Sequence, residues 1–251
     1  MKFVDTHCHL EQSDFASDLD DVITRADNLG IHIITSSITQ SDWRRAVEIA
    51  MKYDNVAVSL GVDPILYDHL NLIPDKWREW TDIIVAIGEV GLDHYRERDH
   101  KLRAVQEQMF RKAILFAKEQ DLPIQVHSRS AGKKALEVLR DCDANMVHMH
   151  AFDGKAGLAR VASNEYDYYF SIPTSVVRSP QKQKLVKAVN IERLLLETDS
   201  PVLGPDKGVR NEPSNIPLVV KEIANILKLS EEEVRQITLE NTLHLYKRIK
   251  L

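Results

Sequence analysis

The segment FVDTHCHLEQ, residues 3–12, places three polar side chains where a buried strand should end. In a β-strand, residues two apart point to the same face, so Asp5, His7 and His9 should project the same way. Two imidazoles a few ångströms apart can bind one divalent metal ion. A His-x-His pair also arises by chance at the end of a surface strand, so the rest of the chain has to decide between the two interpretations.

This first strand begins a series in which short apolar segments alternate with longer segments of helical periodicity. The expected strands are residues 2–7, 31–37, 55–61, 82–88, 122–127, 144–150, 166–172 and 192–198, and the expected helices are residues 15–29, 41–53, 69–80, 99–120, 131–140, 154–164, 179–189 and 215–228. Strands that alternate with helices require a parallel sheet, and eight units without a linker favour a closed barrel over an open doubly wound sheet. We therefore expect an α/β fold, a (β/α)8 TIM barrel, as a single domain over residues 1–251.

One more helix is expected after the eighth unit. Ser230 and Glu233 form the S-x-x-E pattern of a capping box, and Val234, Ile237 and Leu245 follow at roughly helical spacing. We expect this additional C-terminal helix to pack on the outside of the barrel.

Composition excludes several classes of protein. With 43% hydrophobic and 28% charged residues, the chain has an ordinary globular composition. The net charge of −5 argues against a broad basic surface that binds nucleic acid by charge alone. Residues 1–10 lack a signal-peptide pattern and no apolar run approaches the length of a membrane span, so we expect a cytoplasmic protein that does not bind membranes. The two cysteines, Cys8 and Cys142, have no spacing typical of a thiolate zinc site.

The polar residues at the expected strand ends form a pattern, and in such barrels the chemistry lies at the C-terminal ends of the strands. These residues are His7, His9, Glu89, His127, His150 and Asp199. Six nitrogen and oxygen ligands suffice for two divalent ions if one carboxylate bridges them. We expect His7, His9 and Asp199 to bind the first ion, His127 and His150 the second, and Glu89 both. Nitrogen-rich ligands suit Zn²⁺ or Mn²⁺ better than Mg²⁺.

Each of these assignments competes with a structural explanation. His148 shares a strand face with His150, and we interpret it as a core histidine or a partner of a ligand. Glu89 lies between Gly88 and Gly91, and packing does not explain a carboxylate between glycines at a strand end. Asp93, in the same stretch, is interpreted as structural or as a partner of a ligand.

Asp199 follows a continuous apolar strand in LLLETDSPVL, residues 194–203. An aspartate at that position can simply cap a turn. It can also bind metal and accept a proton from a bridging water, whose pKa a metal ion lowers toward ~7. We expect the second role.

Several motifs together, in order along essentially the whole chain, resemble the TatD-related metal-dependent hydrolases of the amidohydrolase superfamily. The motifs are DTHCHL at 5–10, GEVGLD at 88–93, HSR at 127–129, HAFDG at 150–154, ETDSP at 197–201 and RNEP at 210–213. The resemblance implies a TIM barrel with a two-metal site and a metal-dependent deoxyribonuclease activity, often 3′ to 5′. It also implies that Arg129 and Arg210 line the substrate pocket, where a guanidinium group suits a phosphate or a carboxylate.

One departure from the family pattern concerns the substrate. The family usually has Gly-x-His-Pro after the third strand, whereas this chain has Asp63 within Gly61–Pro64. A carboxylate in the pocket would repel a phosphodiester. Glu89, in contrast, occupies the position at which other branches of the superfamily carry a carbamylated lysine, which favours the nuclease-like branch.

Three functions remain at this point. The first is hydrolysis of a DNA phosphodiester by a metal-bridging hydroxide that Asp199 helps to generate. The second is hydrolysis of a carboxylic ester or amide, such as an aminoacyl bond, at the same site, which Asp63 and the acidic net charge keep open. The third is a non-catalytic barrel that binds metal or a partner protein. No Gly-rich nucleotide loop, GxSxG elbow or Walker lysine is present, so we expect no nucleotide cofactor.

Overall fold

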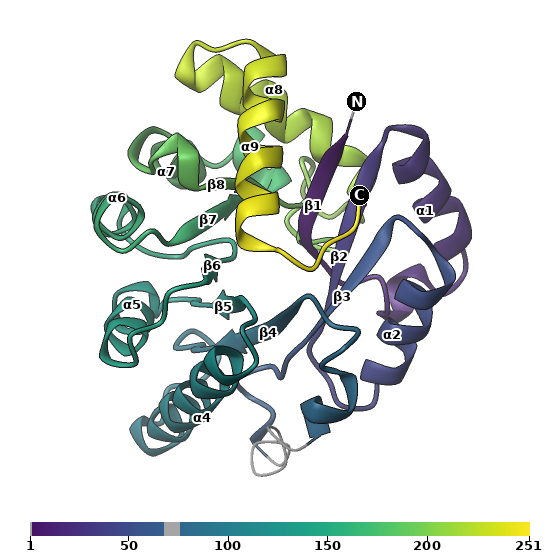
Figure 1. Ribbon diagram of the computed structural model, residues 1–251. Coiled ribbons are helices and arrows are strands. Elements are labelled where there is room, and N and C mark those ends of the chain that lie inside the picture. Colours follow the sequence, from purple (N-terminus) through teal and green to yellow (C-terminus); the bar gives the residue numbers. More distant parts are fainter. Residues whose placement is uncertain (1, 68–75) are drawn as a thin grey trace.

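The computed structural model describes residues 2–67 and 76–251 and contains one sheet of eight strands in sequence order (Figure 1). The strands are β1 (Phe3–Cys8), β2 (Ile31–Ser37), β3 (Val56–Leu60), β4 (Ala86–Gly91), β5 (Ile124–His127), β6 (Val147–Met149), β7 (Tyr169–Ile172) and β8 (Leu194–Leu196). Each consecutive pair of strands is parallel. Thr6 Oγ1 donates to Leu196 O over 2.8 Å, so β1 also lies beside β8. The predicted (β/α)8 TIM barrel is confirmed.

Helices surround the strands in Figure 1, as the alternating pattern predicts. They are α1 (Leu19–Asn28), α2 (Trp43–Lys52), α4 (His100–Glu119), α5 (Gly132–Asp141), α6 (Ala156–Glu165), α7 (Pro180–Ala188) and α8 (Ile216–Leu227). Of the helix expected over residues 69–80, residues 69–75 lie outside the described part of the chain, and the rest includes a 3₁₀ turn, Arg78–Trp80. The fourth strand was expected at 82–88 but runs from Ala86 to Gly91, so Glu89 lies within β4 rather than after it.

The core lies between the outer face of the barrel and the surrounding helices. On α4, for example, Met109, Ala113 and Phe116 recur at helical spacing and are buried. Burying one such large side chain contributes roughly 1.5–3 kcal/mol, and this contribution is repeated around the ring. The barrel therefore holds the strand ends rigidly in place.

The additional C-terminal helix is α9 (Glu231–Leu245), and its predicted capping box is present. The end of this segment has a further role that the sequence did not predict. Leu245 and Tyr246 pack against Val4, Ala86 and other residues near the beginnings of the strands. The Tyr246 hydroxyl reaches into the barrel, where it accepts a hydrogen bond from Gln125 Nε2 over 3.0 Å. The C-terminal segment thus closes one end of the barrel, and the opposite end carries the predicted site.

Within the described ranges, we find no helix that combines the length and the apolar character required to span a membrane.

Candidate functional site

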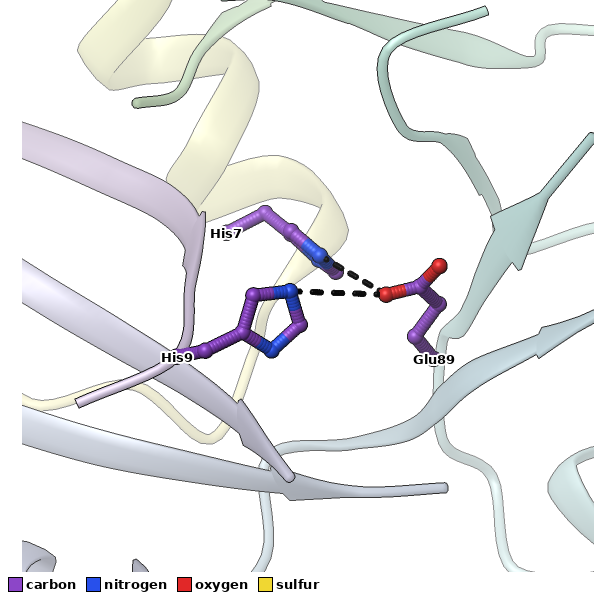
Figure 2. A group of neighbouring side chains, drawn as sticks. All are labelled: His7, His9 and Glu89. Atoms are coloured by element: carbon purple, nitrogen blue, oxygen red, sulfur yellow. Dashed lines mark hydrogen bonds and ion pairs between the residues drawn. The ribbon is translucent and has the colours of Figure 1, made fainter. Parts of the chain in front are cut away.

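The six predicted side chains converge at the C-terminal ends of the strands. Figure 2 shows His7 and His9, from β1 and the residues after it, pointing at Glu89 of β4. Glu89 Oε2 lies 3.2 Å from His7 Nε2 and 3.6 Å from His9 Nε2. On the other side of the same carboxylate, Oε1 lies 3.2 Å from His150 Nε2 and contacts His127 Nδ1. Glu89 therefore lies between the two pairs of imidazoles.

Asp199 completes this arrangement from the loop after β8. Its Oδ1 atom lies 3.4 Å from His9 Nε2 and 3.7 Å from His7 Nε2. Ligand atoms within 4.8 Å of one another form three overlapping groups: His7, His9 and Glu89; His7, His150 and Asp199; and Glu89, His127 and His150. The overlap at Glu89 is what a bridging carboxylate requires.

Glycines let the neighbouring strands approach Glu89 closely. A Cβ atom added to Gly91 would lie 2.1 Å from the carbonyl oxygen of His127 on β5. A Cβ atom added to Gly61, just after β3, would lie 2.1 Å from the carbonyl oxygen of Glu89 itself. Gly91 also has a φ of +146°, which L side chains rarely adopt. The glycines beside Glu89 are therefore required by close packing of the backbone around the carboxylate.

Each histidine of the site has its second ring nitrogen beside a hydrogen-bond acceptor. The pairs are His7 Nδ1 with Gln125 Oε1 at 3.1 Å, His9 Nδ1 with Ser36 O at 2.7 Å, His127 Nε2 with Asp93 Oδ2 at 3.1 Å, and His150 Nδ1 with Glu197 Oε2 at 3.4 Å. An acceptor draws the ring proton to the nitrogen that it faces. The nitrogen that faces the centre of the site is then left with a lone pair, as in metal-binding histidines.

A divalent cation fits these residues. His127 Nδ1 is buried and makes no hydrogen bond among the described residues, although it contacts Glu89 Oε1. A nitrogen lone pair against a carboxylate oxygen is repulsive unless positive charge lies between them. Imidazole nitrogens and carboxylate oxygens are the donors that Zn²⁺ and Mn²⁺ accept.

The charges in the site depend strongly on one another. Burial by itself would raise the pKa of Glu89, but the neighbouring His150 and His127 hold it well below its usual range. Burial would lower the pKa of His9, but the hydrogen bond to Asp199 and the charge of Glu89 raise it to about 9. Without a cation, the carboxylates thus raise the pKa values of His9, His127 and His150 and draw protons onto these rings, whereas burial lowers the pKa of His7. A metal ion would displace these protons, so metal binding and proton release are linked.

A cavity of about 580 Å³ opens above these side chains and is lined by His9, Glu89, His127, His150 and Asp199, among others. Arg129 and Asp63, both predicted to contact substrate, also line it. The Arg129 guanidinium carbon lies 4.0 Å from the centre of the Tyr95 ring, and the group makes no ion pair within the described residues. Arg129 therefore presents a free positive charge at the cavity.

Asp63 does not present a free negative charge. Its two carboxylate oxygens accept hydrogen bonds from Arg96 over 2.9 and 2.7 Å. Arg96 also donates to Asp93, which in turn contacts His127. The acid that replaces the family histidine is thus neutralised by a nearby arginine.

Arg210 is not brought to the cavity. Its guanidinium group donates to both carboxylate oxygens of Asp18, over 2.7 and 2.6 Å, and it stacks on Phe15. The predicted contact of Arg210 with substrate therefore has no geometric support in this arrangement.

Sequence reasoning did not identify several residues that shape the site. Gln125 is the polar residue within the apolar part of LPIQVH, and this exception to the apolar pattern could have indicated its role. Glu197 lies in the quoted ETDSP motif but was given no role. Lys182, on α7, lines the cavity and carried no sequence signal. His148 lies outside the three ligand groups and contacts Tyr246 and Ser171 in the barrel interior.

Comparison with known proteins places these features in a family. The family model described as TatD related DNase matches residues 4–247. The chain is 39% identical to the putative deoxyribonuclease TATDN3 of Mus musculus over 98% of this chain and 89% of that protein. It is 38% identical to the deoxyribonuclease TATDN3 of Homo sapiens over 98% of this chain and 95% of that protein. An uncharacterized metal-dependent hydrolase of Methanocaldococcus jannaschii is 36% identical over 99% of this chain and 98% of that protein.

Solved structures show the same fold. The TatD homologue YJJV of Escherichia coli has a TM-score of 0.89 at 24% identity, with 98% of each chain covered. With the match of the family model over nearly the whole length, these findings show that the chain belongs to the TatD-related DNase family.

Proposed function

We propose that this protein hydrolyses phosphodiester bonds of DNA, from the 3′ end, with two divalent metal ions. The observation that carries the proposal is the orientation of four imidazoles. Each has one ring nitrogen beside an acceptor outside the site and the other beside Glu89 or Asp199. The names of the curated relatives, a deoxyribonuclease and metal-dependent hydrolases, support the same reaction class.

We assign His7, His9 and Asp199 to one ion, His127 and His150 to the other, and Glu89 to both. The short distances from Glu89 to both pairs of imidazoles, and from Asp199 to His9, support this assignment. When bound, such ions supply positive charge for the phosphoryl oxygens and make a water molecule more acidic. We also treat residues 1–251 as one domain, because groups from His7 to Tyr246 take part in the site and its supports.

In this reaction, we expect Asp199 to act on the attacking water and Arg129 to bind the substrate. Asp199 is 7% exposed and lines the cavity, so it can accept the proton of the attacking water. The amide nitrogen of Asp199 donates to the carbonyl oxygen of His7 over 2.9 Å, which holds the loop against β1. The free guanidinium of Arg129 can bind a phosphate oxygen at the mouth of the cavity.

The pairing of Asp63 with Arg96 favours a phosphodiester over a carboxylic ester. The ester hypothesis rested on the acidic net charge and on repulsion between the carboxylate of Asp63 and a phosphate, and Arg96 neutralises the charge of Asp63. Arg129 and Lys182 also line the cavity and form no ion pair within the described residues, so two positive groups are available to a bound phosphate.

The test uses purified protein, stripped with chelator and reloaded with Mn²⁺, Zn²⁺ or Mg²⁺. Single-stranded oligonucleotides labelled at the 3′ or the 5′ end are expected to shorten progressively from the 3′ end in the presence of metal. Asp199→Asn should abolish shortening while the bound metal is retained, and Asp27→Asn, an exposed change on α1, should leave it unaffected. Intact DNA alongside cleavage of a simple ester would contradict the proposal.

A further inference from the structure

Lys182 places a buried ammonium group in the wall of the cavity. It lies on α7, is 8% exposed, and lines the same cavity as His150 and Asp199. Its Nζ atom donates to the carbonyl oxygens of Ala151 over 2.7 Å and of Phe152 over 3.0 Å. These carbonyls belong to the turn that directly follows His150.

The hydrogen bonds of Lys182 are incomplete. An ammonium group has three donors, and two of them are used by the carbonyls. No carboxylate in the described part of the chain lies within ion-pair distance of Nζ. Burial lowers the pKa of Lys182, although the charges of Glu197, Asp153 and Asp199, at longer range, act in the opposite direction. A bound anion would accept from the third donor and would form the direct ion pair that Lys182 lacks within the described residues.

A purely structural role does not require a cation at this position. Gln181, the preceding residue, already donates through Nε2 to the Phe152 carbonyl over 3.2 Å and to the Gly154 carbonyl over 3.3 Å. A neutral amide therefore supports the same turn. The positive charge of Lys182 remains unexplained by the fold.

A second residue that lines this cavity also has a polar atom without a hydrogen-bond partner. Ser128 follows the ligand His127, is 3% exposed, and lines the cavity. Its buried Oγ atom has no hydrogen-bond partner among the described residues. Buried polar groups in folded proteins nearly always have partners, so Ser128 and Lys182, which line the same cavity, each have a donor available for a polar ligand.

We propose that Lys182 is a substrate-binding residue that holds an anionic phosphoryl oxygen of the bond to be cleaved. This inference rests on the proposed function and deepens it, because it specifies a substrate whose reacting group carries negative charge. A neutral ester carries no negative charge for this lysine to bind before the reaction begins. Substrates with an anionic phosphodiester should therefore depend on Lys182, and neutral esters should not.

The test compares Lys182→Gln, Lys182→Arg and Gln181→Met in manganese-loaded protein. Lys182→Gln keeps an amide donor near the turn but removes the charge, and Lys182→Arg keeps the charge. Gln181→Met is the matched control, since it removes a donor to the same turn without changing the charge of the cavity. The measurements are the dissociation constant of inorganic phosphate by calorimetry, kcat/KM on bis(4-nitrophenyl) phosphate and on 4-nitrophenyl acetate, and the metal content.

We expect Lys182→Gln to weaken phosphate binding and to lower kcat/KM on the phosphodiester by at least about tenfold, as for loss of a charged hydrogen bond. Metal content and any activity on the acetate should be unchanged, and Lys182→Arg and Gln181→Met should stay within about threefold of the unmodified protein. Phosphate affinity that is unchanged in Lys182→Gln, or reduced equally in Lys182→Arg, would overturn the inference. The phosphate titration needs no turnover, so it tests Lys182 separately, whereas failure of the unmodified protein to cleave any phosphodiester refutes the proposed function instead.

Discussion

Tyr246 connects the closed end of the barrel to the candidate metal site, so removing its hydroxyl should weaken both stability and metal binding. The hydroxyl accepts from Gln125 Nε2 over 3.0 Å and lies 2.5 Å from His148 Nδ1. Gln125 in turn contacts His7, which faces Glu89. Tyr246→Phe keeps the ring, which is fully buried, and removes only these two polar contacts.

The expected loss of stability comes from Gln125 Nε2 and His148 Nδ1, because each loses the Tyr246 hydroxyl as a hydrogen-bond partner. Each buried polar group that loses its partner costs about 1–3 kcal/mol. Gln125 Nε2 still donates to Thr6 O over 3.0 Å, so its cost lies at the lower end of that range, and the free energy of unfolding should fall by about 2–4 kcal/mol in total. In a chain of this length, 1 kcal/mol shifts Tm by roughly 2–4 °C, which gives a decrease of roughly 5–15 °C. Metal affinity should fall by up to about tenfold, since Tyr246 acts on His7 only through Gln125.

The assay combines thermal unfolding of the chelated protein with calorimetric titration of Mn²⁺. Tyr166→Phe serves as the matched control because the Tyr166 hydroxyl makes no hydrogen bond among the described residues, and it should match the unmodified protein in both measurements. A Tyr246→Phe variant with unchanged Tm would refute the role of the hydroxyl in stability. Lower stability with unchanged metal affinity would refute the connection to His7.

Three further predictions test the site and its surroundings. Asp93→Asn should weaken metal binding by roughly 10–100-fold, because it replaces a carboxylate that orients His127, and a metal titration showing less than a twofold change would contradict this role. Gly91→Ala should give little folded protein on expression, because its Cβ would lie 2.1 Å from a carbonyl oxygen, and a soluble variant with normal Tm would contradict the packing argument. The hydrogen bond from Arg25 holds the pKa of Glu212 below its ordinary value, so its contribution to stability is complete above about pH 4.5 and is lost as the pH falls through the lower, folded-state pKa. Urea unfolding of Glu212→Gln should therefore show a deficit at pH 7 that closes toward pH 3, and a deficit that does not change with pH would argue against the ion pair.

The order of the strands and the meeting of the six polar side chains could be predicted from the sequence. Both follow from the order of strands and helices along the chain. A strand–helix repeat requires parallel strands, and parallel strands place all their C-terminal ends at one end of a barrel. His7, Glu89, His127 and Asp199 therefore meet although up to 192 residues separate them, and only their position relative to a strand end was needed. The capping box at Ser230 was equally local, since both of its partners lie within one helical turn.

Other features depended on side-chain packing between distant elements, which periodicity does not encode. The sequence placed Asp63 and Arg210 in the pocket, but only the tertiary structure shows that Arg96 neutralises the first and that Asp18 binds the second. Periodicity also does not predict that Tyr246 enters the barrel or that Lys182 is buried in the cavity wall. The direction of a long side chain is set by the space and the partners that other elements leave for it, so these contacts are determined only when the whole barrel has formed.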